Sequence, residues 1–503
     1  MEKFKTFVVI LFVLHLNISS AIASGVAREW VVIEPDTIEA DDIVVDDSGN
    51  VYVTGCGNMY GYFYFTIKYE PDGNEVWHDS YYGPYSATSG DDSATEIALD
   101  SSGNVYVTGS SEADKYSYSD FATIKYDTDG NEVWVRRFSG PGDRNDFPTD
   151  LALDRSDNVY VVGASVYDAE SFNYTTFKYD PNGVMLWYVH YNGPGNGQDI
   201  VREMVIDDAG NVYLTGTSQG DGTEGDIATI KYDTDGNEMW VRRYNGSADQ
   251  DDAAIGIALD SSSNVYVTGK TLTPDWDIDI VTIKYDTNGN QEWFEYYDGP
   301  LGNHDVPVDI AVDDSDYIYV AGKSGVTTDD YVVIKYDPNG VQMWVSVYED
   351  FVYKDIPRAM AVDNSGNVYV TGRREESGVT EPDILTIKYD TNGKLAWADS
   401  FNGADDHKDI PNAITVDNSG KIYVTGVSYV YDYDPGYYGS NFVTIKYEQC
   451  GDIDHPYPTG DLDNDCKVDL FDFALTAESW HITFFDLVDI TENWLICNEP
   501  VCD

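Results

Sequence analysis

The decapeptide DSSGNVYVTG, residues 100–109, recurs in close copies along almost the whole chain. The copies end at Gly55, Gly109, Gly163, Gly216, Gly269, Gly322, Gly372 and Gly426, at intervals of 50 to 54 residues. Eight copies at a nearly fixed interval are typical of a repeat architecture, in which each copy forms one supersecondary unit.

A second signature keeps step with the first. Each copy is followed by a strand such as FATIKY and, in seven copies, by a turn such as DTDGN and a tryptophan. These tryptophans are Trp77, Trp134, Trp187, Trp240, Trp293, Trp344 and Trp397. The eighth is absent, whereas Trp30 in REWVVIE precedes the first repeat without partner strands. We therefore expect the N-terminal strand to complete the last repeat and to close a ring without open sheet edges.

One repeat, residues 95–138, contains four segments that alternate as strands, separated by turns rich in Asp, Gly and Asn. Four antiparallel strands in about fifty residues match one propeller blade. The predicted fold is therefore an all-β, monomeric, eight-bladed β-propeller over residues 24–449, with repeats of about 53 residues. The constant turns should form one rim. The variable connections, such as residues 271–279 and 428–441, should form the other rim, where binding is expected.

The pattern in IALDSSSNVYVTG and IVTIKYDTNGNQEW resembles the bacterial SBBP-type β-propeller repeat. The resemblance covers about residues 28–449. It implies a propeller fold and an extracellular setting, but no uniform activity. One departure is the Ile-Lys-Tyr third strand, where the usual copy is Ala-Lys-Leu-like, and it concerns packing more than function.

Residues 1–23 carry Lys3 and Lys5, a largely apolar run, and a small-x-small site at Ala21-Ile22-Ala23. This pattern predicts a secretory signal peptide, and hence an extracellular protein. No later stretch is apolar enough to predict membrane insertion. The formal net charge of −61 would repel phosphate backbones, which argues against nucleic-acid binding.

Three features invite other interpretations. A lysine recurs at Lys68, Lys125, Lys178, Lys231, Lys284, Lys335, Lys388 and Lys446, but eight equivalent copies favour an ion pair or a solvated rim over catalysis. The GNEVW segment is similar to the Gly-x-x-x-Trp docking motif of eight-bladed quinoprotein dehydrogenases, but we favour a blade-locking tryptophan, because a buried aromatic contributes a large apolar area. The tyrosines at 429, 431, 433, 437 and 438 could stack on sugars or fold on themselves.

The segment GDLDNDCKVDLFDFALTAESW indicates a separate calcium-binding module at residues 450–503. Five carboxylates and one carbonyl stand at loop positions 1, 3, 5, 7, 9 and 12, an oxygen set suited to Ca²⁺: Asp461, Asp463, Asp465, Lys467, Asp469 and Asp472. The aspartate at position 12 and the duplicated helix pattern at 471–480 and 485–494 resemble dockerin type I. The second copy lacks an acidic loop, so we expect one Ca²⁺, a helical fold and a cohesin-like or cell-surface partner.

Four of the five cysteines, at 450, 466, 497 and 502, fall in this module. Three pairings are possible, of which we favour Cys466 with Cys497 and Cys450 with Cys502. Cys56 is then expected to be a buried free thiol.

These features predict a secreted, non-enzymatic binding or scaffold protein. Its propeller would recognise a glycan or a protein, and its tail would mediate calcium-dependent attachment. The alternative is an enzyme on the same scaffold, either a polysaccharide-degrading glycoside hydrolase or lyase, or a quinoprotein-like oxidoreductase. The sequence singles out no catalytic residue, and the fold class hosts both kinds of function.

Overall fold

Alternating apolar and polar residues build four strands per repeat, and the two middle strands are buried on both faces because neighbouring sheets stack on them. In the second repeat, Val105, Tyr106 and Val107 are all buried. The computed structural model describes residues 26–449 apart from residues 36, 59–60, 85–91, 113–117, 143, 169–170, 300–303, 326–328, 350–351, 377–380, 404–406 and 432–437.

Eight four-stranded antiparallel sheets, here called blades 1 to 8, follow one another along the chain. Blade 1 comprises β2 (Thr37–Val45), β3 (Val51–Asn58), β4 (Tyr62–Tyr69) and β5 (Glu75–Tyr81), and blade 2 comprises β6 (Ser93–Leu99), β7 (Val105–Glu112), β8 (Ser119–Tyr126) and β9 (Glu132–Phe138). Blade 3 comprises β10 (Asp146–Leu153), β11 (Val159–Asp168), β12 (Ser171–Tyr179) and β13 (Met185–Tyr191), and blade 4 comprises β14 (Asp199–Ile206), β15 (Val212–Gln219), β16 (Gly225–Tyr232) and β17 (Glu238–Tyr244).

Blade 5 comprises β18 (Ala253–Leu259), β19 (Val265–Leu272), β20 (Ile278–Tyr285) and β21 (Gln291–Tyr297), and blade 6 comprises β22 (Val306–Val312), β23 (Ile318–Ser324), β24 (Asp330–Tyr336) and β25 (Gln342–Tyr348). Blade 7 comprises β26 (Tyr353–Val362), β27 (Val368–Glu376), β28 (Asp383–Tyr389) and β29 (Leu395–Phe401), and blade 8 comprises β30 (Asp409–Val416), β31 (Ile422–Tyr431), β32 (Tyr438–Gln449) and β1 (Val26–Glu34).

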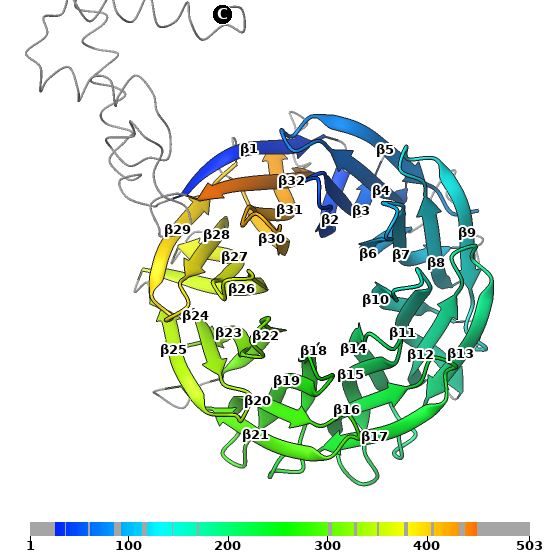
Figure 1. Ribbon diagram of the computed structural model, residues 1–503, viewed down its shortest axis with the longest axis vertical. Helices are drawn as coiled ribbons and strands as arrows, with labels where there is room; N and C mark the ends of the chain where they lie inside the picture. Colours follow the sequence, from blue (N-terminus) through cyan, green and yellow to red (C-terminus); the bar gives the residue numbers. More distant parts are fainter. Residues whose placement is uncertain are drawn as a thin grey trace, which may run out of the picture. The chain divides into compact units, whose positions relative to one another are not determined.

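Residues 30–395 and 400–446 form one compact unit, in which the blades surround a central axis (Figure 1). Blade 8 has the strand order β1-β32-β31-β30, so its outermost strand comes from the opposite end of the chain. The predicted closure by the N-terminal strand is therefore confirmed. The other described residues, 26–29, 396–399 and 447–449, form a second unit, in which Arg28 pairs with Asp399 at 2.8 Å and Trp397 stacks on Tyr447.

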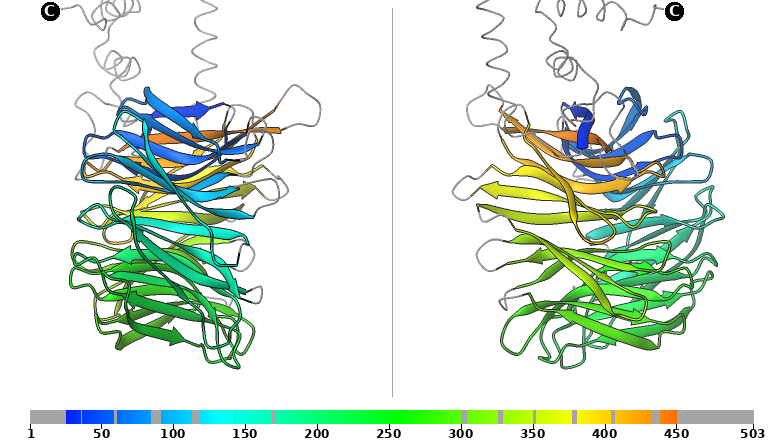
Figure 2. Two further views of the ribbon diagram at one scale, coloured as in Figure 1. Left: turned by 90° about the vertical axis from the view of Figure 1, so that its right-hand side faces the viewer. Right: turned by 60° about the vertical axis from the view of Figure 1, so that its left-hand side comes forward.

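The antiparallel strands run across the thickness of the ring, so their ends form two rims (Figure 2). The turns after the first and third strands of each blade lie at one rim, here called the turn rim. The connections after the second and fourth strands lie at the other, here called the loop rim. In a typical turn, the Asp100 carboxylate accepts backbone N–H groups from Ser102 and Asn104. Gly103 takes φ +79°, a left-handed conformation that favours glycine.

At the turn rim, a lysine and a tryptophan of one blade donate to the same carbonyl of the next. In blade 2, the Lys125 Nζ and Trp134 Nε1 atoms lie 3.4 and 3.2 Å from the Pro181 oxygen. The same arrangement joins Lys178 and Trp187 to Thr234, Lys231 and Trp240 to Thr287, and Lys284 and Trp293 to Pro338. Lys125 also lies 3.3 Å from Asp100 and over the Tyr106 ring, whose hydroxyl donates to Asp100. We call this arrangement the blade latch.

The latch explains the repeated lysine. Seven of the eight lysines are buried, and Lys68 is half-buried. The predicted ion pair with a turn aspartate is confirmed at Lys125 and Lys178, whereas the alternative of a solvated rim is wrong. The third strand of a blade places the lysine against the next blade, where its buried ammonium group needs hydrogen-bond acceptors.

Closure reproduces the latch with residues from opposite ends of the chain. Trp30 in β1 donates to the Pro71 oxygen at 3.0 Å, and Lys446 in β32 donates to the same oxygen at 2.6 Å. A Cβ atom on Gly73 would lie 3.0 Å from the Trp30 ring, so this turn requires glycine for the close approach. Trp30 therefore replaces the eighth tryptophan that the last repeat lacks.

Inner-strand carboxylates also join the blades. A β-bulge in the inner strand presents an acidic residue in five blades, and in four of them the carboxylate accepts a backbone N–H of the next blade: Asp42, Asp150, Glu203 and Asp309. The Asp150 carboxylate accepts the backbone N–H groups of Leu151 and Met204, each at 2.7 Å. Asp309 accepts those of Ile310 and Met360 in the same way. These acids therefore have structural partners.

The described residues contain no helix, and hence none that is long and apolar enough to cross a membrane. Cys56 is a buried free thiol, as expected. The predicted signal peptide and the predicted calcium-binding helical module, with its two favoured disulfides, lie outside the described residues.

Candidate ligand-binding site

The β19–β20 connection in blade 5 is a tight hairpin on the loop rim. The backbone N–H of Thr273 donates to the Asp277 oxygen at 2.8 Å, and that of Trp276 donates to the Thr273 oxygen at 3.0 Å. Trp276 has φ +68°, a left-handed conformation that is uncommon for a bulky residue. Trp276 is 70% exposed in this hairpin. Its large indole ring therefore faces solvent instead of packing in the core.

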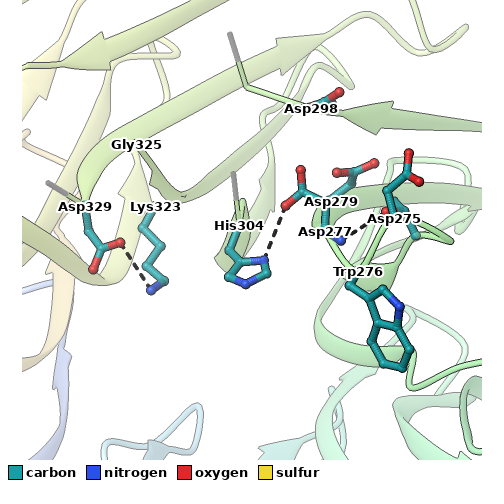
Figure 3. Close-up of a pocket in the computed structure, with 10 residues that line it drawn as sticks. Asp275, Trp276, Asp277, Asp279, Asp298, His304, Lys323, Gly325 and Asp329 are labelled. Carbon is teal, nitrogen blue, oxygen red and sulfur yellow. Dashed lines mark hydrogen bonds and ion pairs between the residues drawn. The ribbon is translucent and has the colours of Figure 1, made fainter. Parts of the chain in front are cut away.

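A cavity of about 730 Å³ opens beside this hairpin, between the connections of blades 5 and 6 (Figure 3). Its volume falls within the range of about 300–1,000 Å³ that is typical of ligand pockets. The residues that line it are Thr273, Asp275, Trp276, Asp277, Asp279, Asp298, His304, Lys323, Gly325 and Asp329. Polar and charged side chains therefore line a cavity with one exposed aromatic ring at its side.

Asp277, Asp279 and Asp298 form an acidic triad on the blade 5 side of the cavity. One carboxylate oxygen of each lies within 4.8 Å of the other two. Burial raises the pKa of Asp279 to about 6, and the nearby carboxylates of Asp298, Asp277 and Asp305 add to this effect. The Asp279 Oδ1 atom is shielded from solvent and has no hydrogen-bond partner among the described residues. The triad thus holds negative charge that the protein leaves poorly compensated.

The basic groups of the cavity are mostly engaged elsewhere. Lys323 and Lys354 lie 3.5 and 2.9 Å from the Asp329 carboxylate. Burial alone would raise the pKa of Asp329, but these two ammonium groups lower it. His304 lies with its Nδ1 atom 3.3 Å from the Asp277 carboxylate, and only a protonated imidazole would neutralise that charge. Figure 3 shows His304 between the acidic triad and the Lys323–Asp329 pair.

The site residues predicted from the sequence lie elsewhere in the chain. The calcium ligands predicted at Asp461, Asp463, Asp465, Lys467, Asp469 and Asp472 lie outside the described residues. In the tyrosine-rich loop, Tyr429 is half-buried and its backbone N–H donates to the Lys408 oxygen. The side chains at 431, 433, 437 and 438 are outside the described set.

Sequence reasoning marked residues 271–279 as a variable connection but did not single out Trp276. The positions of the tryptophans nevertheless set Trp276 apart. Eight of the eleven tryptophans occupy the latch position, and two lie beyond residue 450. Trp276 is the remaining one, off the repeat position in the propeller sequence. Asp298, His304 and Lys323 carried no comparable signal, since they join Trp276 only when blades 5 and 6 pack together.

Comparison with known proteins agrees with the fold. The SBBP beta-propeller repeat matches residues 80–116, 133–165, 188–222, 240–274 and 353–373. SBBP repeats are therefore present, and the molecule is an eight-bladed propeller. The first four matches begin in the fourth strand of one blade and end in or just after the second strand of the next. The sequence repeat is thus offset from the blade, as closure by β1 also shows.

A curated relative is an uncharacterized WD repeat-containing protein of Acanthamoeba polyphaga mimivirus. It is 23% identical over 416 residues, which cover 65% of this chain and 28% of that protein. Among solved structures, Sqt1 from Chaetomium thermophilum has a TM-score of 0.49 at 9% identity, covering 82% of this chain and 99% of that one. The WD40 domain of SCAP from fission yeast has a TM-score of 0.45 at 9% identity, covering 84% and 97%.

Proposed function

We propose that this chain is a secreted, non-enzymatic binding protein, whose loop rim recognises a glycan or a protein at the Trp276 cavity. The exposed indole carries the proposal. A tryptophan in water offers a large, rigid surface to a sugar ring or an apolar side chain, and such residues dominate the binding energy of many interfaces. The carboxylates, His304 and Lys323 around it would fix the orientation of the ligand by hydrogen bonding.

An array of oligosaccharides and peptides, probed with the full chain, tests this proposal. We expect Trp276→Ala to weaken capture of the best ligand at least tenfold, because the indole supplies the contact surface. The matched control is Tyr188→Ala, since Tyr188 is a 49% exposed aromatic on the outer strand β13 of blade 3. Equal capture by wild type and Trp276→Ala would refute the site.

Glycan cleavage is the second candidate, because the raised pKa of Asp279, about 6, lies beside two further carboxylates. A carboxyl with a pKa near 6 keeps its proton in mildly acidic solution and can serve there as a general acid while a neighbour stays ionised. Release of reducing sugars by the purified protein would favour this candidate. The loss of that release in Asp279→Asn would assign it to the cavity.

The C-terminal segment would attach the propeller to a cohesin-like or cell-surface partner in a calcium-dependent manner. The carboxylate spacing from Asp461 to Asp472 supports this part of the proposal. Calorimetry on the full chain should detect about one Ca²⁺ bound, should show that Mg²⁺ substitutes poorly, and should lose the heat in Asp461→Ala. Asp298→Asn is the control, because it removes a carboxylate from the cavity and leaves this loop unchanged.

A further inference from the structure

We infer that the Trp276 cavity takes a primary ammonium group on an aliphatic stem, as the lysine side chain of a partner protein presents it. The inference rests on the proposed function, because it names the chemistry of the ligand that the same cavity would bind. It depends on four features: the spacing of the acidic triad, the charge balance of the cavity, the position of Trp276, and the volume.

The acidic triad has the dimensions of an ammonium site. Three oxygens separated by at most 4.8 Å can share a centre roughly 2.8 Å from each of them, which is the usual length of a charge-assisted N–H···O bond. An ammonium group has three N–H donors and no acceptor. One such group can therefore donate a hydrogen bond to each of Asp277, Asp279 and Asp298.

Other cations fit this spacing less well. Ca²⁺ takes about 6–8 oxygen ligands at about 2.3–2.6 Å, and three separate carboxylates supply only part of that set. A guanidinium is a planar fork that pairs best with both oxygens of one carboxylate. The triad instead offers one oxygen from each of three residues.

The charge balance of the cavity also favours an incoming cation. Asp275, Asp277, Asp279 and Asp298 all line it, whereas its lysine is paired with Asp329 on the blade 6 side. His304 is the basic group nearest to the triad among the lining residues, and it contacts Asp277 alone within the triad. The Oδ1 atom of Asp279 is shielded from solvent and has no donor in the described part of the chain. An added ammonium group would therefore relieve repulsion that the described residues leave in place.

Trp276 distinguishes a lysine from other amines. Figure 3 shows its ring extending from the hairpin, away from the aspartates. The methylene stem of a lysine can lie along the cavity toward this ring while its ammonium reaches the triad. An amino group attached directly to a sugar ring has no such stem. The volume of about 730 Å³ exceeds what one side chain needs and leaves room for neighbouring residues of a polypeptide.

Calorimetry on the full chain with Nα-acetyl-lysine methylamide tests the inference, in about 0.15 M NaCl so that the field of the −61 charge is screened. We expect the lysine probe to bind. The norleucine analogue, which lacks the ammonium, should give no heat. The trimethyl-lysine analogue keeps the charge but loses all three N–H donors, and it should bind about tenfold more weakly.

Two variants localise the effect. Asp298 is exposed, so Asp298→Asn should keep the fold and weaken the lysine probe about tenfold. Asp129→Asn removes the same charge from an exposed turn on the other rim and should leave binding unchanged. If Asp298→Asn fails to fold, the three probes on the wild-type chain still decide the matter.

Several results would overturn the inference. They are equal binding of the lysine and trimethyl-lysine probes, equal weakening by both variants, displacement of the probe by Ca²⁺ at equimolar concentration, or tighter binding of a glucosamine oligomer than of a lysine peptide. If a ligand without an amine is captured and lost in Trp276→Ala, only this inference fails. If neither the array ligands nor the probe respond to Trp276→Ala or Asp298→Asn, the proposed function fails as well.

Discussion

The two rims use the same residue types in opposite ways. At the turn rim, Trp134 is 6% exposed, and Lys125 lies buried against Asp100 and the next blade. At the loop rim, Trp276 is 70% exposed, and Lys323 pairs with an Asp329 that is itself partly exposed. The first set recurs around the ring, whereas the second occurs once among the residues that the structure describes. The difference indicates that the turn rim holds the blades together and that the loop rim is available to a ligand.

The largest effect is expected where the turn rim depends on both ends of the chain. Deleting residues 29–33 removes the Trp30 side of the closing latch and leaves an edge of β32 unpaired. We expect the free energy of unfolding to fall by about 5 kcal/mol or more, since loss of a large aromatic alone costs about 3–5 kcal/mol. Urea unfolding measures the change. Removal of residues 1–24 is the control, and equal stability of the two truncated proteins would contradict closure.

A lysine substitution on each rim gives the next contrast. Lys125→Met breaks a buried pair and leaves Asp100 without its ammonium partner, so we expect a loss of about 2–3 kcal/mol. Lys323→Met removes a pair whose lysine side chain is 30% exposed, and the expected loss is below about 1 kcal/mol. Chemical denaturation of both variants checks this. Equal losses of stability in the two variants would show that Lys125 contributes no more than a partly exposed ion pair does.

The sequence predicted the repeated part of the molecule well, for a physical reason. A strand pattern that recurs eight times reports the same packing each time, so four-stranded blades, tight turns and even the displaced Trp30 could be predicted. The burial of Lys125 could not, because it depends on Pro181 of the next blade. The cavity could not either, since Asp298 and Lys323 come from different blades and meet only after the ring forms.

The carboxylates of the two rims should also contribute to stability in different pH ranges. At the loop rim, burial raises the pKa of Asp146 to about 7, so the stability that its protonated form contributes is lost as pH rises through that value. At the turn rim, burial of Asp154 is outweighed by hydrogen bonds from Asn158 and Ser156, which lower its pKa. Its contribution is lost only as pH falls below about 4.

We therefore expect the free energy of unfolding to fall between about pH 4 and pH 7, by on the order of 3 kcal/mol for Asp146, because each unit of pKa shift is worth about 1.4 kcal/mol. Asp146→Asn should flatten this fall, because the amide oxygen can still accept the Gly140 N–H while the ionisable group is gone. Melting curves across this pH range test the expectation. An unchanged slope in Asp146→Asn would show that another group controls it.

The measurement that tests the contrast most directly is a paired determination of stability and ligand capture for Trp134→Ala and Trp276→Ala. We predict that Trp134→Ala loses about 3–5 kcal/mol of stability and, at a temperature where it remains folded, captures the best array ligand as the wild type does. Trp276→Ala should change stability by less than about 0.5 kcal/mol and lose capture at least tenfold. If Trp276→Ala unfolds the protein as readily as Trp134→Ala, or if both variants capture the ligand equally well, the division of labour between the rims is wrong.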